Sequence, residues 1–269
     1  MNKKLITSFI IFIFATSYQE KANAQVSPQE QIFAERVAML SIDNKCHFFD
    51  GNERRAINAF MLQARGSLLR NGNSDARVGL IMKQAMGGIA NKSCSDPLIV
   101  QEAARVKKAY KSWRMQMNAS FAGTNRVWHA SRAGLDNWRA WQDVGDGIRI
   151  GFVMAQNGLV FGVETPSLNV ATMRVFWRDT KRLGPPKANM GLVAPPRMGT
   201  ITQNATKLLP AVSKQRLDSP PRIGILALFP NDVTRSIVAL DPRDCFEVEI
   251  VQKNGAISKY IVEVGDIIA

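Results

Sequence analysis

The side chains that could carry out chemistry in this 269-residue chain are few and widely spaced. Its two histidines, His47 and His129, lie roughly eighty positions apart. The chain contains no His-Glu-x-x-His zinc motif, no Gly-x-Ser-x-Gly nucleophile motif, no Ser-x-x-Lys pair and no Cys-x-x-Cys pair. The sequence therefore indicates no cofactor and no metal site, and it favours a protein that is not an enzyme.

The three cysteines are Cys46, Cys94 and Cys245. Cys46 and Cys94 each stand at the boundary of an expected helix within one helical stretch, so we expect a disulfide between them. That bridge would close a loop of roughly fifty residues and stabilise the fold by about 4 kcal/mol in the chain-entropy model. The alternative is three separate buried thiols. Cys245 precedes an expected strand among acidic neighbours, which raise the pKa of a thiol and disfavour thiol catalysis.

Tryptophans and carboxylates gather in one stretch of the chain: Trp128, Asp136, Trp138, Trp141, Asp143 and Asp146. Tryptophan rings beside carboxylates would suit stacking on sugar rings together with acid–base cleavage. A carboxylate-dependent hydrolase acting on an envelope polymer is therefore one alternative function. We prefer a packing role for this aromatic group, because Trp138 and Trp141 are three residues apart and would share a helical face at the join between two domains.

Basic side chains follow the fourth expected helix beside its apolar stripe, namely Lys107, Lys111 and Arg114. A row of cations on one helix face would suit contacts to an anionic surface. The simpler alternative is a solvated helix face without a ligand.

Residues 183–222 form a second basic segment and hold seven of the chain's twelve prolines. We expect a long Pro-rich basic loop here, because paired prolines favour extended polyproline II structure that keeps side chains exposed. Its candidate contacts to an anionic surface are Arg197, Lys207, Lys214 and Arg216. Two alternatives remain: the loop wraps the second domain, or residues 183–222 are presented to a protein partner as an interaction module.

Apolar spacing divides the chain into a helical half and a strand-rich half. Between residues 27 and 118, four segments carry apolar residues at helical spacing, and three of them begin with capping residues: Ser27, Asp50 and Asp96. After residue 125 the apolar residues alternate, and Asn157-Gly158 and Asn254-Gly255 indicate two hairpins. Further strands are expected at 170–178 and 222–229, with a short helix after Pro230.

These patterns predict an α+β fold of two domains. A small helical domain of about four helices would occupy residues 25–120, and a mainly antiparallel β domain would occupy residues 121–269.

The first two dozen residues have the order of a secretory signal peptide. Lys3 and Lys4 precede an apolar run from Leu5 to Ala15, and Ala22-Asn23-Ala24 has the small-x-small form of a cleavage site. The apolar run is about eleven residues long, short of the ~20 that a membrane-spanning helix needs. We expect residues 1–24 to be removed, leaving a soluble periplasmic protein without a transmembrane segment.

Charge supplies the main functional signal. From residue 25 onward the chain has 32 basic and 21 acidic residues, a net charge of +11. Such an excess attracts anionic partners, and an exported protein would meet lipid headgroups, lipopolysaccharide or acidic wall polymers rather than nucleic acid. We therefore expect a binding or scaffolding protein that contacts an anionic envelope component or an envelope protein. Charge that serves solubility alone is the alternative.

Overall fold

A computed structural model describes most of the chain from Val26 onward, and the expected signal peptide at 1–24 lies outside it. The described residues are 26–132, 138–155, 158–179, 206–210, 213–219 and 222–267. At 138, 154, 155, 158, 206–210, 213–219, 222 and 267 only the backbone is described. Within these residues no helix is both long enough and apolar enough to cross a membrane.

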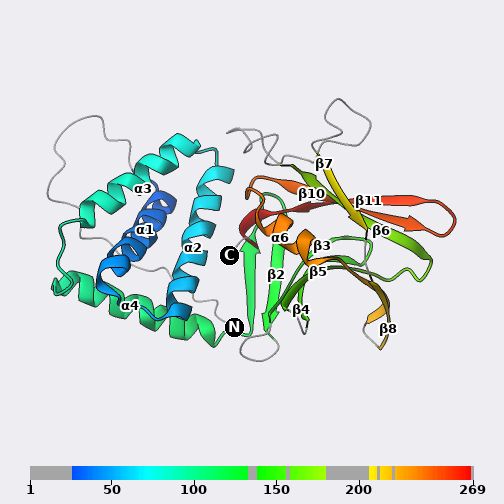
Figure 1. Cartoon of the computed structure of the whole chain (residues 1–269), viewed down its shortest axis with the longest axis horizontal. Coiled ribbons are helices and arrows are strands. Elements are labelled where there is room, and N and C mark those ends of the chain that lie inside the picture. The colour runs from blue at the N-terminus through cyan, green and yellow to red at the C-terminus, as the bar shows by residue number, and fades with distance from the viewer. Residues whose placement is uncertain are drawn as a thin grey trace, which may run out of the picture.

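Four helices form the N-terminal region (Figure 1), as the sequence predicts: α1 (Pro28–Cys46), α2 (Gly51–Arg70), α3 (Asp75–Ile89) and α4 (Pro97–Arg114). Capping sets where the first two helices begin. Ser27 accepts from the Glu30 N–H, and the Glu30 carboxylate accepts in return from the Ser27 N–H. Asp50 and Glu53 make the same reciprocal pair at the start of α2. Each pair satisfies backbone donors that a helix N-terminus otherwise leaves unpaired.

Helices α2 and α3 both pack against α1. One apolar cluster joins these three helices, and it contains Phe33, Val37, Leu68, Leu69, Val78 and Ile81. A second cluster around Ile42 and Phe49 receives Ala103 from α4. Figure 1 shows α4 running along the outer margin of the helical region, beneath α1 and α2 in that view. The helices thus form a three-helix core with α4 laid across it.

The expected disulfide is confirmed. Cys46, the last residue of α1, is bonded to Cys94, and the Cα atoms of the two cysteines lie 5.5 Å apart. Cys94 stands two residues before Asp96, the N-cap of α4. The bridge therefore ties the start of the outer helix to the end of the central one.

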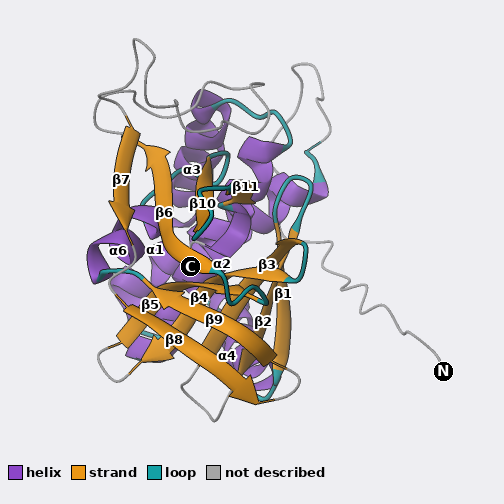
Figure 2. Cartoon of the chain, turned by 90° about the vertical axis from the view of Figure 1, so that its right-hand side faces the viewer, coloured by secondary structure: helices purple, strands orange, loops and turns teal. Residues whose placement is uncertain are grey.

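Most of the described residues after α4 belong to two antiparallel sheets (Figure 2). The larger sheet has the order β1 (Asn118–Ala122), β2 (Val127–Arg132), β3 (Trp138–Gly145), β4 (Ile148–Ala155), β5 (Gly158–Thr165), β9 (Arg222–Leu228) and β8 (Ser213–Ser219). The smaller sheet has the order β11 (Ile257–Glu263), β10 (Cys245–Gln252), β6 (Val170–Arg178) and β7 (Thr206–Pro210). Helices followed by antiparallel strands give the α+β fold that the sequence predicts.

One apolar core fills the space between the two sheets. Trp128, Phe152 and Phe161 enter it from the larger sheet, and Phe246 and Val248 enter it from the smaller one. The expected short helix after Pro230 is α6 (Asn231–Val238), which adds Val233 and Ile237 to this core. The alternating apolar residues that predicted strands are therefore the residues that hold the two sheets together.

Both predicted hairpins are confirmed. Strands β4 and β5 pair up to Ala155 and Gly158, so Gly158 is the first residue of β5 and not part of the turn. At the second hairpin, the Gly255 N–H donates to the Gln252 carbonyl at 3.0 Å, and Gly255 has a φ of +86°. Glycine adopts this left-handed conformation without a steric penalty, which explains why it follows Asn254 here.

The expectation of one long loop at 183–222 is wrong in its second half. Residues 206–210 form β7, which pairs with β6, and residues 213–219 form β8, which pairs with β9. Both are edge strands, and an edge strand tolerates a proline such as Pro210 because one side of its backbone needs no ladder partner. Residues 183–205 of the expected loop lie outside the described residues.

Glu263, the last residue of β11, joins the smaller sheet to the larger one. Its buried carboxylate accepts from three consecutive backbone N–H groups in the turn between β1 and β2, those of residues 124–126, at 2.6 to 3.2 Å. Its carbonyl oxygen accepts from the Trp128 indole N–H at 2.8 Å, and its own N–H donates to the Gln142 side chain at 3.0 Å. One residue of β11 thus reaches β1, β2 and β3.

Two glycines permit this close approach. A Cβ atom on Gly123 would lie 2.2 Å from the Glu263 carboxylate, and one on Gly265 would lie 2.7 Å from the Ala122 carbonyl oxygen. Gly265 also has a φ of +55°, which a larger side chain adopts only with strain. The segment that follows, η2 (Gly265–Ile267), lies against α2.

Replacing both bridged cysteines (Cys46→Ala with Cys94→Ala) should lower the free energy of unfolding by about 4 kcal/mol. The chain-entropy model gives this value for a loop of 48 residues, because the unfolded chain regains the freedom that the bridge removes. Urea unfolding of both proteins, with and without reductant, measures it. Reductant should bring the wild type to the level of the double variant and leave the variant unchanged. Equal stability of the two proteins under oxidising conditions would contradict the expectation.

Candidate anion-binding surface

The N-cap and the basic last turn of α4 favour a helix with the observed boundaries. The Asp96 carboxylate accepts from the Leu98 N–H at 3.0 Å, and Pro97 occupies the first helical position, where no backbone donor is needed. Lys111 and Arg114 stand in the last turn, where cations interact favourably with the negative end of the helix dipole. Local residues alone therefore favour a basic helix that begins and ends here.

The expected apolar stripe of α4 faces the helical core but is only partly covered. Of the residues of α4, all of which the structure describes, Ala103 alone is fully buried. Ile99 and Val106 pack at the margin of the second apolar cluster. The ring of Trp113 meets the ring of Phe60 edge-on, with 5.4 Å between centroids. The opposite face of α4 is left to solvent.

Both ends of α4 are tied to other elements. The disulfide holds its N-terminal end, as described above. At the other end, the Arg132 guanidinium of β2 lies over the Trp113 ring, 5.3 Å from its centroid, and donates to the Arg114 carbonyl at 2.9 Å. The Arg132 N–H also donates to the Met117 carbonyl at 2.8 Å. These contacts determine which face of α4 points outward.

The three predicted basic residues of α4 lie along one edge of its exposed face. Lys111 and Arg114 are exposed, and Lys107 is half-buried. Lys107 and Arg114 stand close enough to Asp50 to help lower the pKa of its carboxyl, although the backbone N–H of Glu53 contributes most to that shift. These two cations are therefore partly balanced by an acidic neighbour.

Lys108 is a basic residue of this surface that the sequence reasoning missed. It is exposed and lies three residues before Lys111, on the side of α4 turned away from the core. The three predicted cations border the apolar stripe, whereas Lys108 lies on the opposite side of the helix, in the middle of the exposed face. A helical projection opposite Ala103 would have found Lys108, because residues about half a turn from a buried position face outward.

The other predicted basic residues are not brought to this surface by any described contact. Arg197 lies outside the described residues. Lys207 stands in β7 opposite Trp177, and Lys214 and Arg216 stand in β8 opposite Ala227 and Ile225. Their backbones belong to edge strands of two different sheets. Their proposed role at an anionic surface stays a prediction.

The aromatic group does not share one face. Trp128 is fully buried in the core, where its indole N–H is bonded to Glu263. Trp138 and Trp141 belong to strand β3, so the expectation of a common helical face is wrong. Residues three apart in a strand lie on opposite sides of the sheet, because side chains alternate with a period of two. Trp141 is half-buried, and its ring lies 6.0 Å from the His129 ring.

The carboxylates near the tryptophans are occupied by other partners. Asp143 is exposed and paired with Arg149 at 3.3 Å, and Asp146 accepts from the Tyr260 hydroxyl at 3.3 Å. Asp136 lies outside the described residues. No contact between described residues joins Asp143 or Asp146 to a tryptophan in the way that a sugar-cleaving site requires.

Cys245 is buried, and its thiol is poorly suited to nucleophilic chemistry. Burial first, and then the nearby carboxylates of Asp244, Glu263 and Glu247, raise the pKa of the thiol to about 12. A thiol with that pKa carries almost no thiolate at neutral pH. Among the described residues, no group of three or more His, Cys, Asp or Glu side chains is placed to hold a metal ion.

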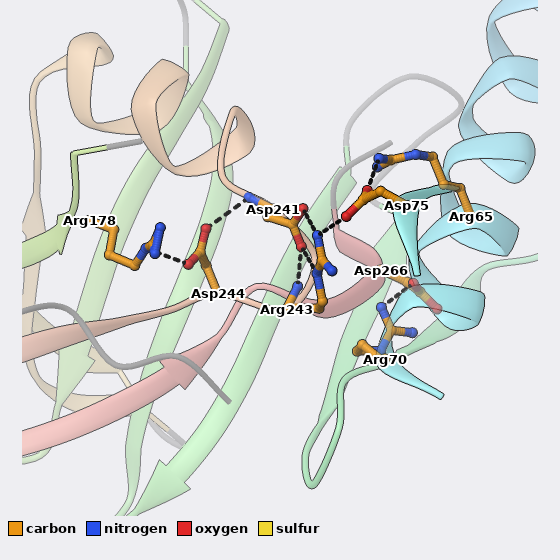
Figure 3. A network of polar contacts seen from close by, with 8 residues as sticks. All are labelled: Arg65, Arg70, Asp75, Arg178, Asp241, Arg243, Asp244 and Asp266. Atoms are coloured by element: carbon orange, nitrogen blue, oxygen red, sulfur yellow. Dashed lines mark hydrogen bonds and ion pairs between the residues drawn. The ribbon is translucent and has the colours of Figure 1, made fainter. Parts of the chain in front are cut away.

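Figure 3 shows a chain of ion pairs and hydrogen bonds between the helices and the sheets. Arg65 of α2 meets Asp75 of α3 at 3.1 Å, and Asp75 also meets Arg243 at 3.1 Å. Arg243 is almost fully buried and pairs with Asp241 at 2.7 Å. The Asp241 N–H donates to Asp244 at 3.1 Å.

The chain of ion pairs continues into the smaller sheet and has a second branch. Asp244 pairs with Arg178 of β6 at 3.0 Å. Separately, Arg70 of α2 meets Asp266 of the C-terminal segment at 2.7 Å. Sequence reasoning missed all of these pairs. The two that join the helices to the rest of the fold, Arg243–Asp75 and Arg70–Asp266, connect residues more than a hundred positions apart, and nothing in local spacing indicates such pairs. They act as a structural link between the helices and the sheets.

Burial raises the pKa of two carboxyl groups of this network, those of Asp244 and Asp266. It raises the pKa of Asp244 to about 6, although the facing Arg178 lowers it and the neighbouring Asp241 raises it further. Burial also raises the pKa of Asp266, against the opposing effect of Arg70. Removing these groups from water disfavours their charged form more than their partners favour it.

Comparison with known proteins does not assign a function. No protein-family model, no curated protein and no solved structure matches the chain.

Replacing Arg243 with methionine should lower the free energy of unfolding by about 3 kcal/mol, because it leaves the buried Asp241 carboxylate without its cation. The matched control is Arg235→Met. Arg235 pairs with Asp232 on α6, where the two side chains are 75% and 70% exposed, so its loss should change stability by no more than about 0.5 kcal/mol. Urea unfolding measures both variants. Equal effects would show that the Arg243 pairs do not link the two regions.

Replacing Asp244 with asparagine should remove the part of the wild-type stability that is lost as the pH rises from 4 to 7. The pKa of Asp244 is raised in the folded protein, so its contribution is fully present below about pH 4 and is lost as the pH rises through 6. The stability of the variant relative to the wild type should therefore increase between pH 4 and pH 7. Urea unfolding across that range tests this, and a constant difference between the two proteins would refute it.

Proposed function

We propose that this protein is exported to the periplasm and acts as a binding or scaffolding protein that contacts an anionic envelope component through α4. The observation that carries the proposal is the outward face of α4. On that face Lys108 and Lys111 are exposed, and Arg114 is exposed at its edge, on a helix whose two ends are tied to neighbouring elements.

Electrostatics favours an anionic partner over a neutral one. From residue 25 onward the chain has a net charge of +11, which attracts anions over distances of about a Debye length. On α4 the cations lie within about two turns of one another, on a helix that is already folded. Little conformational entropy is therefore lost when they meet a ligand.

Export is supported by the residue order at 1–24 and is compatible with the Cys46–Cys94 bridge, since disulfides persist in oxidising compartments.

A hydrolase built on the tryptophan group has less support, because Trp128 is buried and Asp143 and Asp146 have other partners.

The protein should bind a polyglutamate resin in low salt and elute as salt is raised. The variant K108Q/K111Q/R114Q should lose at least about ten-fold in affinity, since each cation near an anionic surface is worth on the order of 1 kcal/mol. The experiment uses the chain processed during export, with mass spectrometry reporting whether it begins at Gln25.

The matched control is K83Q/R235Q/K253Q, which removes the same charge from exposed positions on α3, α6 and the last hairpin. Its affinity should fall much less. Equal losses in the two triple variants would assign binding to net charge and refute a role for α4. Failure of the wild type to bind in low salt would refute the proposed function itself.

A further inference from the structure

The outward face of α4 combines cations with large apolar side chains. Lys108, Lys111 and Met115 follow one another at spacings of three and four, so they form one row along the helix. Met115, which directly follows α4, is 76% exposed, and Met117 is 55% exposed. At the other end, Leu98 and Val100 are 44% and 46% exposed.

These apolar side chains do not serve the core. The stripe that packs inward contains Ile99, Ala103 and Val106, and it lies on the opposite side of the helix from Lys108. The sequence places Met117 on that inward stripe. The helix ends at Arg114, however, and Met117 instead stands exposed one residue before β1.

The dimensions and position of α4 suit a flat partner. With 18 residues at 1.5 Å per residue, the helix is about 27 Å long, and it lies along the outer margin of the molecule (Figure 1). Lys108, Lys111 and Met115 form a row over the middle and C-terminal part of the helix, Met117 is exposed just beyond it, and Leu98 and Val100 are exposed near its other end. Cations beside exposed apolar side chains suit the interface of a membrane, where charged headgroups cover an apolar layer.

We propose that α4 binds the surface of an anionic phospholipid bilayer, with Lys108 and Lys111 at lipid phosphates and Met115 and Met117 inserted between headgroups. The inference rests on the proposed function and names the anionic component. A soluble acidic polymer would use the cations but would gain nothing from two exposed thioether side chains. A bilayer uses both, because its headgroups are charged and the layer beneath them is apolar.

The test measures the binding of two double variants, M115S/M117S and its control L80S/M86S, to two probes. The probes are vesicles of phosphatidylglycerol and phosphatidylcholine, and soluble polyglutamate, each titrated with the exported and processed chain in low salt. The variant M115S/M117S should lose about ten-fold in vesicle partitioning, since burial of apolar side chains adds to binding by roughly this factor. Its affinity for polyglutamate should not change.

The matched control is L80S/M86S, which removes two side chains of α3 that are each 46% exposed. It should leave binding to both probes unchanged. Because all four residues are exposed, each variant should keep the unfolding midpoint of the wild type, and urea unfolding checks this.

The outcomes separate this inference from the proposed function. Binding to polyglutamate without binding to vesicles would overturn the bilayer proposal and leave the α4 surface as a polymer-binding site. Unchanged vesicle binding by M115S/M117S, or an equal loss for both probes, would also overturn it. Absence of binding to either probe by the wild type would instead refute the proposed function.

Discussion

The arrangement of this fold depends on the hydrogen bonds that the buried Glu263 carboxylate accepts from the turn between β1 and β2. A carboxylate removed from water needs donors, and the turn between β1 and β2 supplies three consecutive N–H groups. The turn can approach only because Gly123 and Gly265 have no side chain in the way. Three residues further on, Asp266 meets Arg70 of α2. The end of the chain thereby connects the smaller sheet, the larger sheet and the helices.

This connection determines what the helical region presents to solvent. The Arg70–Asp266 and Arg243–Asp75 pairs hold α2 and α3 against the sheets, and Arg132 holds the end of α4 against β2. The disulfide holds its beginning. With both ends tied, α4 cannot turn its basic side toward the core, and its cations stay exposed although they are close in sequence to apolar residues. The surface is thus a consequence of the links between the helices and the sheets.

Much of the candidate surface could be predicted from periodicity. The spacing of Ile99, Ala103 and Val106 identified the inward side of α4, and Lys107, Lys111 and Arg114 were found by their position beside it. The same method failed at Trp138 and Trp141, because a spacing of three favours a helix only where the segment is helical, and hydrogen bonds to β2 and β4 make this one a strand. The expectation of a loop, which rested on the prolines of 183–222, failed at 206–210 and 213–219, where the backbone pairs with β6 and β9.

The sequence by itself determined the four N-terminal helices, the caps at Ser27, Asp50 and Asp96, both hairpins and the Cys46–Cys94 pair, because each depends on residues close along the chain or on elements that are themselves predictable. Only the tertiary structure decided the partners of Glu263 across the sheets and the Arg243–Asp75 pair, which join residues more than a hundred positions apart, and the exposure of Met115 and Met117. Such contacts require the closure of long loops. Which residues then meet is set by how all the helices and strands pack together, and no local pattern of residue types records that packing.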